Sequence, residues 1–453
     1  MNISSKVLFF SSAFLVLTTG IACKLFREYD STSIADGRLQ EAFYQGNYSR
    51  ADSLLKTTKV TEYLKKGKEF NGRNLLYLDM GFLSYMNANY LASSEYYLKA
   101  IKSDDNLKPI TLAYELDPTQ KILTHYYLAL NYIAMDKTED AMVEMRQIDI
   151  LNSTQPHPLG HLFLGWFYEW NGDANNAFIA YRNAYQLYSK EGSKYSMVLP
   201  LQLKEDIIRT AKQMNFTNEV TSFERDFNLK LSNIDTQSEG GYALVVVENG
   251  FVPELKPLVA NLRWNRTNIS SKGVLFGMDY NTWSVGGSVS KSDRRGDTLE
   301  RYLNNISNFQ LRTSTYYEKP AMLTATISNQ AAKYTTQTIM NVSDYYLQQE
   351  QKNLQQKLDN QLVSQIVQNI QSRIKAEARS KKRYADYSNM TVYVNNNPSN
   401  WKQLPHTLSY ARIPLHAGSN SLTIQADGYN RVITVDGKKN RNQLVTVRFP
   451  SNR

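Results

Sequence analysis

The feature that constrains the fold most is a pattern of small and aromatic residues that recurs four times between residues 38 and 189. The clearest copy comprises Gly165, Tyr168, Gly172, Ala177, Tyr181 and Ala184. The matching positions in the earlier copies are Ala129, Tyr132, Asp136, Ala141, Met145 and Ile148, then Gly81, Ser84, Ala88, Ser93, Tyr97 and Ala100, and in a partial first copy Gly46, Tyr48, Ala51 and Leu55. A small residue on one helix lets a second helix approach closely, and Gly or Asp suits the turn between them. The sequence therefore predicts a stack of helix pairs, closed by a fifth, degenerate pair at residues 203–227.

This pattern resembles the tetratricopeptide repeat (TPR), whose period is about 34 residues. The turn positions Gly46, Ala88, Asp136 and Gly172 are 42, 48 and 36 residues apart, so we expect longer connections between the pairs. The resemblance implies a curved α-solenoid whose concave wall is built from the first helix of each pair. That wall would contain Leu78, Phe82, Tyr85, Tyr126, Leu130, Ile133, Leu162, Trp166 and Glu169.

The apolar members of this wall form a candidate partner groove, which consists of Phe82, Tyr85, Tyr126, Leu130, Ile133, Leu162 and Trp166. An apolar and aromatic groove suits a hydrophobic peptide or a partner helix. The alternative is that a later segment of the same chain fills the groove. The sequence leaves both open.

The N-terminal residues have the layout of a secretory signal peptide. Lys6 precedes an uncharged run at residues 7–17, and small residues lead to Ala22 and Cys23. The apolar run is shorter than the roughly 20 residues that a membrane-spanning helix needs. We therefore predict a signal peptide at residues 1–22.

The segment 20–23 resembles the lipobox of bacterial lipoproteins, with Gly20 where leucine is usual. The resemblance implies cleavage after Ala22 and a lipid on Cys23, and Lys24 after the cysteine would favour the outer membrane. Cys23 is the only cysteine of the chain, so no disulfide framework competes for it. An ordinary signal peptide with an incidental cysteine is the alternative.

The formal charge of +10 and the pI of about 9.2 favour acidic partners. We expect no nucleic acid as a partner of an exported chain. Anionic lipid, lipopolysaccharide or an anionic cell-wall polymer are the candidates, and a basic solvated surface without a specific partner is the alternative.

The chain is predicted to be α+β, with a helical-repeat domain at residues 23–231, a mixed region at 232–386 and a β-sandwich at 387–453. Strands are expected at 242–247, 273–278 and 283–289, followed by a helical stretch from 299 to about 383 that contains a long Gln-rich helix. That helix would carry an apolar stripe formed by Leu354, Leu358, Leu362, Ile366, Ile370 and Ile374. Further strands at 391–394, 408–415, 421–426, 432–435 and 444–449 would form a small antiparallel sandwich.

Four blocks carry a more specific resemblance: residues 245–253, 385–386, 401–405 and 413–418. They look like blocks of a poorly characterised family of TPR-containing bacterial lipoproteins, often encoded beside LpoB-type activators of penicillin-binding proteins. The last block also resembles the PEGA-type β-module of surface proteins. In the family the second and third blocks nearly adjoin, whereas 14 residues separate Asp386 from Trp401 here.

Few residues point to catalysis or to a cofactor. Ser288 and Lys291 match a Ser-x-x-Lys pattern, but its companion motifs are absent from the sequence. His157 and His161 lie one helical turn apart without a further ligand nearby, which favours capping or packing over metal binding.

We therefore expect a non-enzymatic protein without cofactor or metal. It would be an outer-membrane lipoprotein, facing the periplasm or the cell surface, that scaffolds envelope proteins of unknown identity. A peptidoglycan-binding or anionic-polymer-binding lipoprotein is the alternative, and a cell-wall hydrolase is the weaker one.

Overall fold

A computed structural model describes residues 37–67, 72–105, 115–230, 232, 238–252, 255–270, 273–280, 283–290, 308–316, 324–329, 332–357, 368–369, 372, 389–393, 401–426, 428–439 and 441–450. The chain divides into two compact units. The main unit comprises Met1–Val252, Ala321–Val342 and Ser399–Arg453, and the inserted unit comprises Pro253–Pro320 and Ser343–Pro398.

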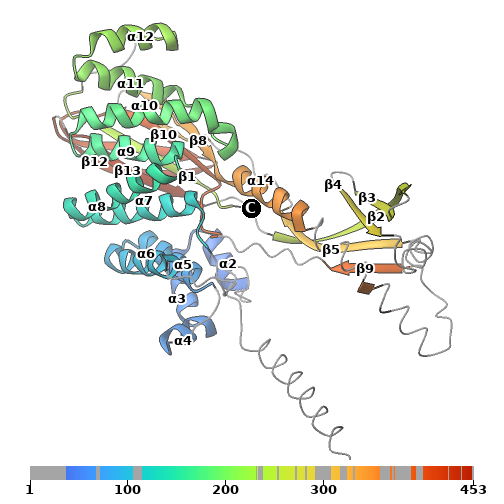
Figure 1. Cartoon of the computed structure of the whole chain (residues 1–453). Helices are drawn as coiled ribbons and strands as arrows, with labels where there is room; N and C mark the ends of the chain where they lie inside the picture. Colours follow the sequence, from blue (N-terminus) through green and yellow to red (C-terminus); the bar gives the residue numbers. More distant parts are fainter. Residues whose placement is uncertain are drawn as a thin grey trace, which may run out of the picture. The chain divides into compact units, whose positions relative to one another are not determined.

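The first half of the main unit is a stack of antiparallel helix pairs (Figure 1). The pairs are α2 (Gly37–Tyr44) with α3 (Tyr48–Lys56), α5 (Arg73–Met86) with α6 (Tyr90–Asp105), α7 (Pro118–Ala134) with α8 (Thr138–Thr154), α9 (Pro158–Trp170) with α10 (Ala174–Glu191), and α11 (Leu201–Gln213) with α12 (Thr217–Phe227). The short helices α4 (Lys59–Lys65) and η1 (Gly192–Tyr195) lie between pairs. The predicted helical repeats and the predicted fifth pair are thus confirmed.

The turns within the pairs lie at the residues that the repeat pattern indicates. Gly46, Ala88, Asp136 and Gly172 have φ angles of 72°, 56°, 57° and 80°, a left-handed conformation that ends a helix. The small residues of the first helices allow close approach, because a Cβ added to Gly81 would lie 2.8 Å from the ring of Tyr97.

Two four-stranded sheets complete the main unit. The first has the order β13-β1-β10-β8 and the second β12-β11-β6-β7. Their strands are β1 (Tyr242–Asn249), β6 (Thr326–Ser328), β7 (Lys333–Thr335), β8 (Gln337–Asn341), β10 (Thr407–Pro414), β11 (Gly418–Ala426), β12 (Tyr429–Gly437) and β13 (Gln443–Phe449). The pairing of β1 with β13 is parallel, and the other ladders of both sheets are antiparallel.

The prediction of an all-antiparallel sandwich within residues 387–453 is therefore wrong. Strand β1 lies between β10 and β13, so the C-terminal strands need a strand from about 160 to 200 residues earlier to pair their backbone groups. Strands β6, β7 and β8 likewise come from the region assigned to the middle domain.

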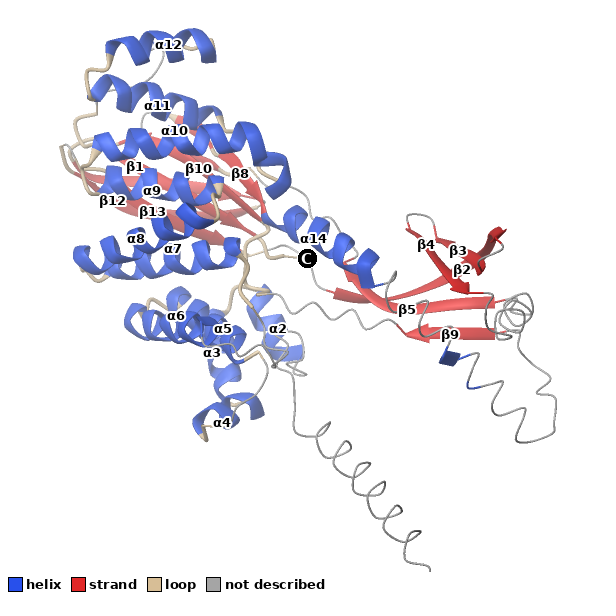
Figure 2. Ribbon diagram, in the orientation of Figure 1, coloured by secondary structure: helices blue, strands red, loops and turns tan. Residues whose placement is uncertain are grey.

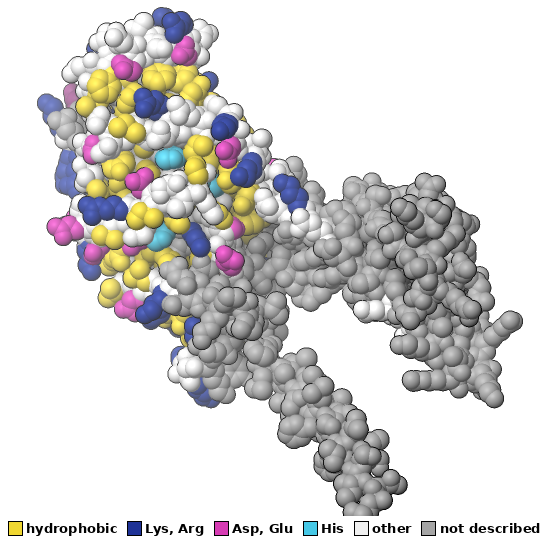
Figure 3. Space-filling view, in the orientation of Figure 1, with side chains coloured by type: hydrophobic (Ala, Val, Ile, Leu, Met, Phe, Trp, Pro, Cys, Tyr) yellow, Lys and Arg dark blue, Asp and Glu magenta, His cyan; other side chains and the backbone are white. Residues whose placement is uncertain are grey.

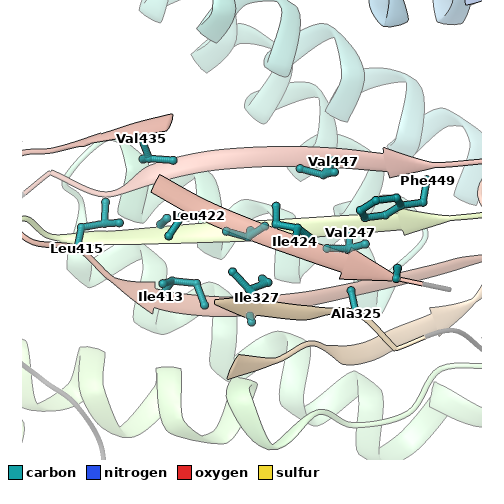
Figure 4. Close-up of a cluster of buried hydrophobic side chains, with 14 residues drawn as sticks. Val247, Ala325, Ile327, Ile413, Leu415, Leu422, Ile424, Val435, Val447 and Phe449 are labelled. Carbon is teal, nitrogen blue, oxygen red and sulfur yellow. The ribbon is translucent and has the colours of Figure 1, made fainter. Parts of the chain in front are cut away.

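Side chains of β1 alternate between two buried faces. Ala243, Val245 and Val247 point into the apolar cluster between the sheets (Figure 4), while the intervening residues face the helices. All eight residues of β1 are buried, as expected for a strand covered on both sides. Figure 2 shows the helices stacked along the strands of the first sheet, so the main unit has three layers.

The inserted unit contains a five-stranded sheet with the order β4-β3-β2-β5-β9. Its strands are β2 (Leu255–Ser270), β3 (Gly273–Tyr280), β4 (Trp283–Ser290), β5 (Asn308–Tyr316) and β9 (Asn389–Tyr393). The predicted helical stretch over 299–383 is wrong at its start, because β5 to β8 occupy part of it, where Thr, Ile and Tyr favour strands. Helix α14 (Val342–Lys357) falls within it, and the stripe residues after Leu354 lie outside the described residues.

Candidate functional site

The chain's own first sheet covers the candidate partner groove. Phe82, Tyr126, Leu162 and Trp166 are fully buried and Leu130 is 6% exposed, while Tyr85 and Ile133 are partly buried. The ring of Trp166 lies 4.9 Å from that of Tyr410 on β10, and the Tyr126 hydroxyl lies 2.8 Å from Thr446 Oγ1 on β13. The prediction of a groove that is open to a partner is therefore wrong, because these side chains already pack on the chain's own strands.

Between the helices and the sheet lies a buried ion network formed by Glu169 of α9, Asp206 and Arg209 of α11, and Arg412 of β10. Arg412 Nε donates to Asp206 Oδ1 at 2.7 Å, and Arg412 Nη2 bonds Glu169. Arg209 Nη2 lies 2.7 Å from Glu169 Oε1. The four side chains are at most 5% exposed. Arg412 thus ties two successive helix pairs to the sheet.

The network balances two carboxylates with two guanidiniums. Burial raises the pKa of the Glu169 carboxyl, but Arg209 and Arg412 outweigh it and hold the pKa at about 2. The Tyr181 hydroxyl also donates to Glu169 at 2.5 Å. Both guanidiniums lie over the ring of Tyr242, at 5.7 and 5.3 Å from its centroid. Glu169 is therefore held as a carboxylate away from solvent.

A second buried pair lies further along the same interface. Arg448 Nη1 of β13 donates to Glu248 Oε2 of β1 at 3.1 Å, and the Tyr127 hydroxyl of α7 donates to Glu248 at 2.9 Å. Burial raises the pKa of Glu248. The Arg448 guanidinium that faces this carboxyl lowers the pKa, but by less than burial raises it. The Arg448 guanidinium also lies over the rings of Phe251 and Phe82. These contacts join α5 and α7 to the sheet.

A polar cavity of about 890 Å³ opens beside the ion network. Its lining residues come from the α9–α10 turn, α11, the segment before β1 and the β12–β13 connection: Glu169, Gly172, Ala174, Arg209, Lys212, Gln213, Ser238, Glu239, Gly241, Tyr242, Lys439 and Asn442. Buried Glu169 and Arg209 form part of its wall, and Lys212, Gln213, Glu239 and Lys439 are exposed. The cavity is within the size range of small-ligand sites.

The remaining sequence-predicted residues fall in several places. Ala22 and Cys23 lie outside the described residues, as does Lys291, while Ser288 is part of β4. His157 is the N-cap of α9: its Nδ1 accepts from the Leu159 amide at 3.1 Å, and Nε2 lies 3.1 Å from Thr119 Oγ1. Burial lowers the pKa of His157 to about 3, so the imidazole is neutral. The predicted capping role is confirmed.

The described part of the chain has neither a metal-ligand cluster nor a helix suited to cross a membrane. It contains no group of three or more His, Cys, Asp or Glu residues placed to hold a metal ion. None of its helices combines the length and the apolar character needed to span a membrane.

Sequence reasoning missed the partners of Glu169. A signal was present in the strand predicted at 408–415, where Arg412 stands between apolar residues. Because side chains alternate between the two faces of a strand, this position places Arg412 on a buried face. A buried arginine requires carboxylates opposite it. Which carboxylates these are depends on the pairing of distant elements.

No family model and no curated protein matches this chain. Among solved structures, the apo form of RapI is similar with a TM-score of 0.33 and 14% identity over 42% of this chain and 65% of that chain. MamA from AMB-1 is similar with a TM-score of 0.29 and 15% identity over 44% of this chain and 92% of that one. A putative kinesin light chain of Podosopora anserina, with nearly identical TPR-like repeats, has a TM-score of 0.32 and 14% identity over 42% of this chain and 89% of that one. The chain spans about two thirds of RapI, and likeness at this level says nothing about activity or partners.

Proposed function

We propose that this protein is a membrane-anchored lipoprotein that scaffolds other proteins in the bacterial cell envelope. One observation carries the proposal: an N-terminal export and lipidation pattern ending at Cys23 precedes a stack of helix pairs. Stacked helix pairs form extended surfaces that suit contacts with other proteins. The lipid would hold that surface at a membrane.

The surface available to a partner is the outer side of the second helices, because the first helices pack on the sheet. Large apolar side chains are exposed there: Leu91 and Leu98 on α6, Val143 and Ile150 on α8, and Ile179 on α10. Val143 and Ile179 each follow the repeat alanine by two residues, so they occupy equivalent positions in neighbouring pairs. Figure 3 shows apolar side chains over this helical face. We assign this surface to an envelope protein with an apolar contact patch.

The anchor predicts that Cys23→Ala moves the protein from the membrane fraction to the soluble fraction. Each buried methylene of a lipid chain contributes about 0.8 kcal/mol to membrane binding, and the variant has no thiol to acylate. Cell fractionation and detergent phase partition, followed by immunoblotting, measure the change. Lys24→Ala is the matched control and should stay with the membrane. A Cys23→Ala protein that fractionates like the wild type would show that the anchor hypothesis is wrong.

The scaffold predicts a partner that depends on the outer helical surface. A double variant, Val143→Glu with Ile179→Glu, should reduce recovery of the partner about tenfold or more, because it places two charges in an apolar contact. Tagged protein is purified from native membranes, and co-purified envelope proteins are quantified by mass spectrometry. Val432→Glu, at a residue 61% exposed on β12, is the control and should leave recovery unchanged. Equal recovery with both variants would contradict this surface.

A further inference from the structure

Hydrogen bonds and ion pairs join several side chains of the inner wall of the polar cavity to one another. Glu169 bonds Arg209, Arg412 and Tyr181, and Asn442 Oδ1 accepts from the Tyr242 amide at 3.1 Å while its Nδ2 donates to Glu169 at 3.4 Å. The Ser238 hydroxyl donates to the Leu415 carbonyl at 2.5 Å. These groups shape the cavity and are held in place, so the wall is rigid before any ligand enters.

The rim of the cavity is different. At the rim lie Lys212 and Gln213 at the end of α11, Glu239 before β1, and Lys439 after β12. Their side chains are exposed and form no hydrogen bond or ion pair within the described residues. The ion network is neutral by itself, so the uncompensated charges around the cavity are two ammonium groups and one carboxylate. Helix α10 also begins at the wall with Ala174, but its N-cap Asp173 accepts from the Asn176 amide at 3.0 Å, so this carboxylate offsets the positive end of the helix.

We propose that this cavity binds a short peptide that carries both a free carboxylate and a free amino group. The two lysines complement the ligand carboxylate, Glu239 complements the amino group, and Gln213 offers an amide to the ligand backbone. A net rim charge of one positive unit fits a carboxylate better than a doubly charged phosphate, which Glu239 would repel. The volume of about 890 Å³ accommodates a peptide of a few residues.

The peptides that cross-link bacterial cell walls have this chemistry, and choosing them as the source rests on the proposed envelope location. The probe is a synthetic cell-wall stem tetrapeptide, compared with tetra-alanine and with stem peptides blocked at the amine or at the carboxylates. Binding to the full-length mature protein is measured by calorimetry in detergent. We expect saturable, salt-sensitive binding of the free stem peptide, and at least tenfold weaker binding of both blocked forms. Equal binding of tetra-alanine would assign the site to peptide ends in general.

Variants of the rim lysines provide the decisive comparison. Lys212→Ala and Lys439→Ala should each weaken binding about tenfold without changing the melting temperature, because neither side chain has a partner in the described structure. Lys190→Ala, at the other end of α10, is the matched control and should bind like the wild type. The proposal is overturned if no peptide binds at millimolar concentration, or if the rim variants bind like the control. A protein that still fractionates with membranes and recovers its partner would then lose only this site, not the proposed function.

Discussion

Replacing Arg412 with methionine is expected to lower the free energy of unfolding by about 3–5 kcal/mol. The substitution leaves Glu169 and Asp206 buried without their shared guanidinium, and an uncompensated buried charge is among the costliest local changes in a protein. Methionine keeps most of the side-chain volume, so the loss of stability reflects the missing charge rather than a cavity. Denaturant unfolding of the mature protein, followed by circular dichroism, measures it.

Two further variants separate the charge effect from other causes. Arg225→Met removes an arginine whose side chain is 77% exposed on α12, and it should change stability by less than about 0.5 kcal/mol. Adding Asp206→Asn to Arg412→Met leaves Glu169 paired with Arg209 at 2.7 Å, so the network is again neutral and the double variant should recover part of the loss. If the double variant is no more stable than Arg412→Met, an unpaired carboxylate is not the cause.

Acid titration of the wild type and of the single variant Glu169→Gln gives an independent check. The folded-state pKa of Glu169 is about 2, below its ordinary value of 4.5, so its ionised form contributes stability above pH 4.5. That contribution is lost as the pH falls from 4.5 towards 2. Glu169→Gln lacks the titrating group, so the difference in stability between wild type and variant should shrink over this interval. A difference that is independent of pH would contradict the assigned pKa.

The helical half could be predicted from sequence because its determinants are local. The turn at Gly172 and the close approach at Gly165 are encoded within one pair, by residues fewer than 20 positions apart. Each strand that the sequence predicts is a short apolar run between turn residues, such as residues 242–247, which lie in β1. Elements of this kind are recognisable without knowing what they pack against.

The sheet order could not be predicted, because it joins distant segments. Strand β1 pairs Val245 with Ala411 on one side and with Val445 on the other. A strand buried on both faces has a continuous apolar pattern that carries no information about its neighbours. Burial of the candidate groove follows from this pairing, because Trp166 packs on Tyr410, which belongs to β10. The sequence therefore left the groove and its alternative undecided.

Replacing Trp401 with alanine is expected to lower the free energy of unfolding by about 3–5 kcal/mol. The side chain is fully buried, and its ring centroid lies 6.0 Å from those of both Tyr97 of α6 and Tyr127 of α7. It is the first described residue of Ser399–Arg453, the segment with which the chain re-enters the main unit from the inserted unit. Removal of the indole leaves a cavity between the helices and this segment, which denaturant unfolding would detect.

Nearby backbone contacts explain why the effect should spread beyond the cavity. The Asn249 carbonyl of β1 accepts from the His406 amide at 2.8 Å, and the Gln403 carbonyl accepts from Arg448 of β13 at 2.8 Å, so the re-entry segment is joined to both β1 and β13. Trp401→Phe is the matched control: the indole N–H has no hydrogen-bond partner in the described structure, so phenylalanine loses only volume and should cost less than half as much. Leu91→Ala, at a residue 59% exposed on α6, should stay within about 0.5 kcal/mol of the wild type. A Trp401→Ala protein as stable as the Leu91→Ala protein would show that the segment does not join the helices to the sheet.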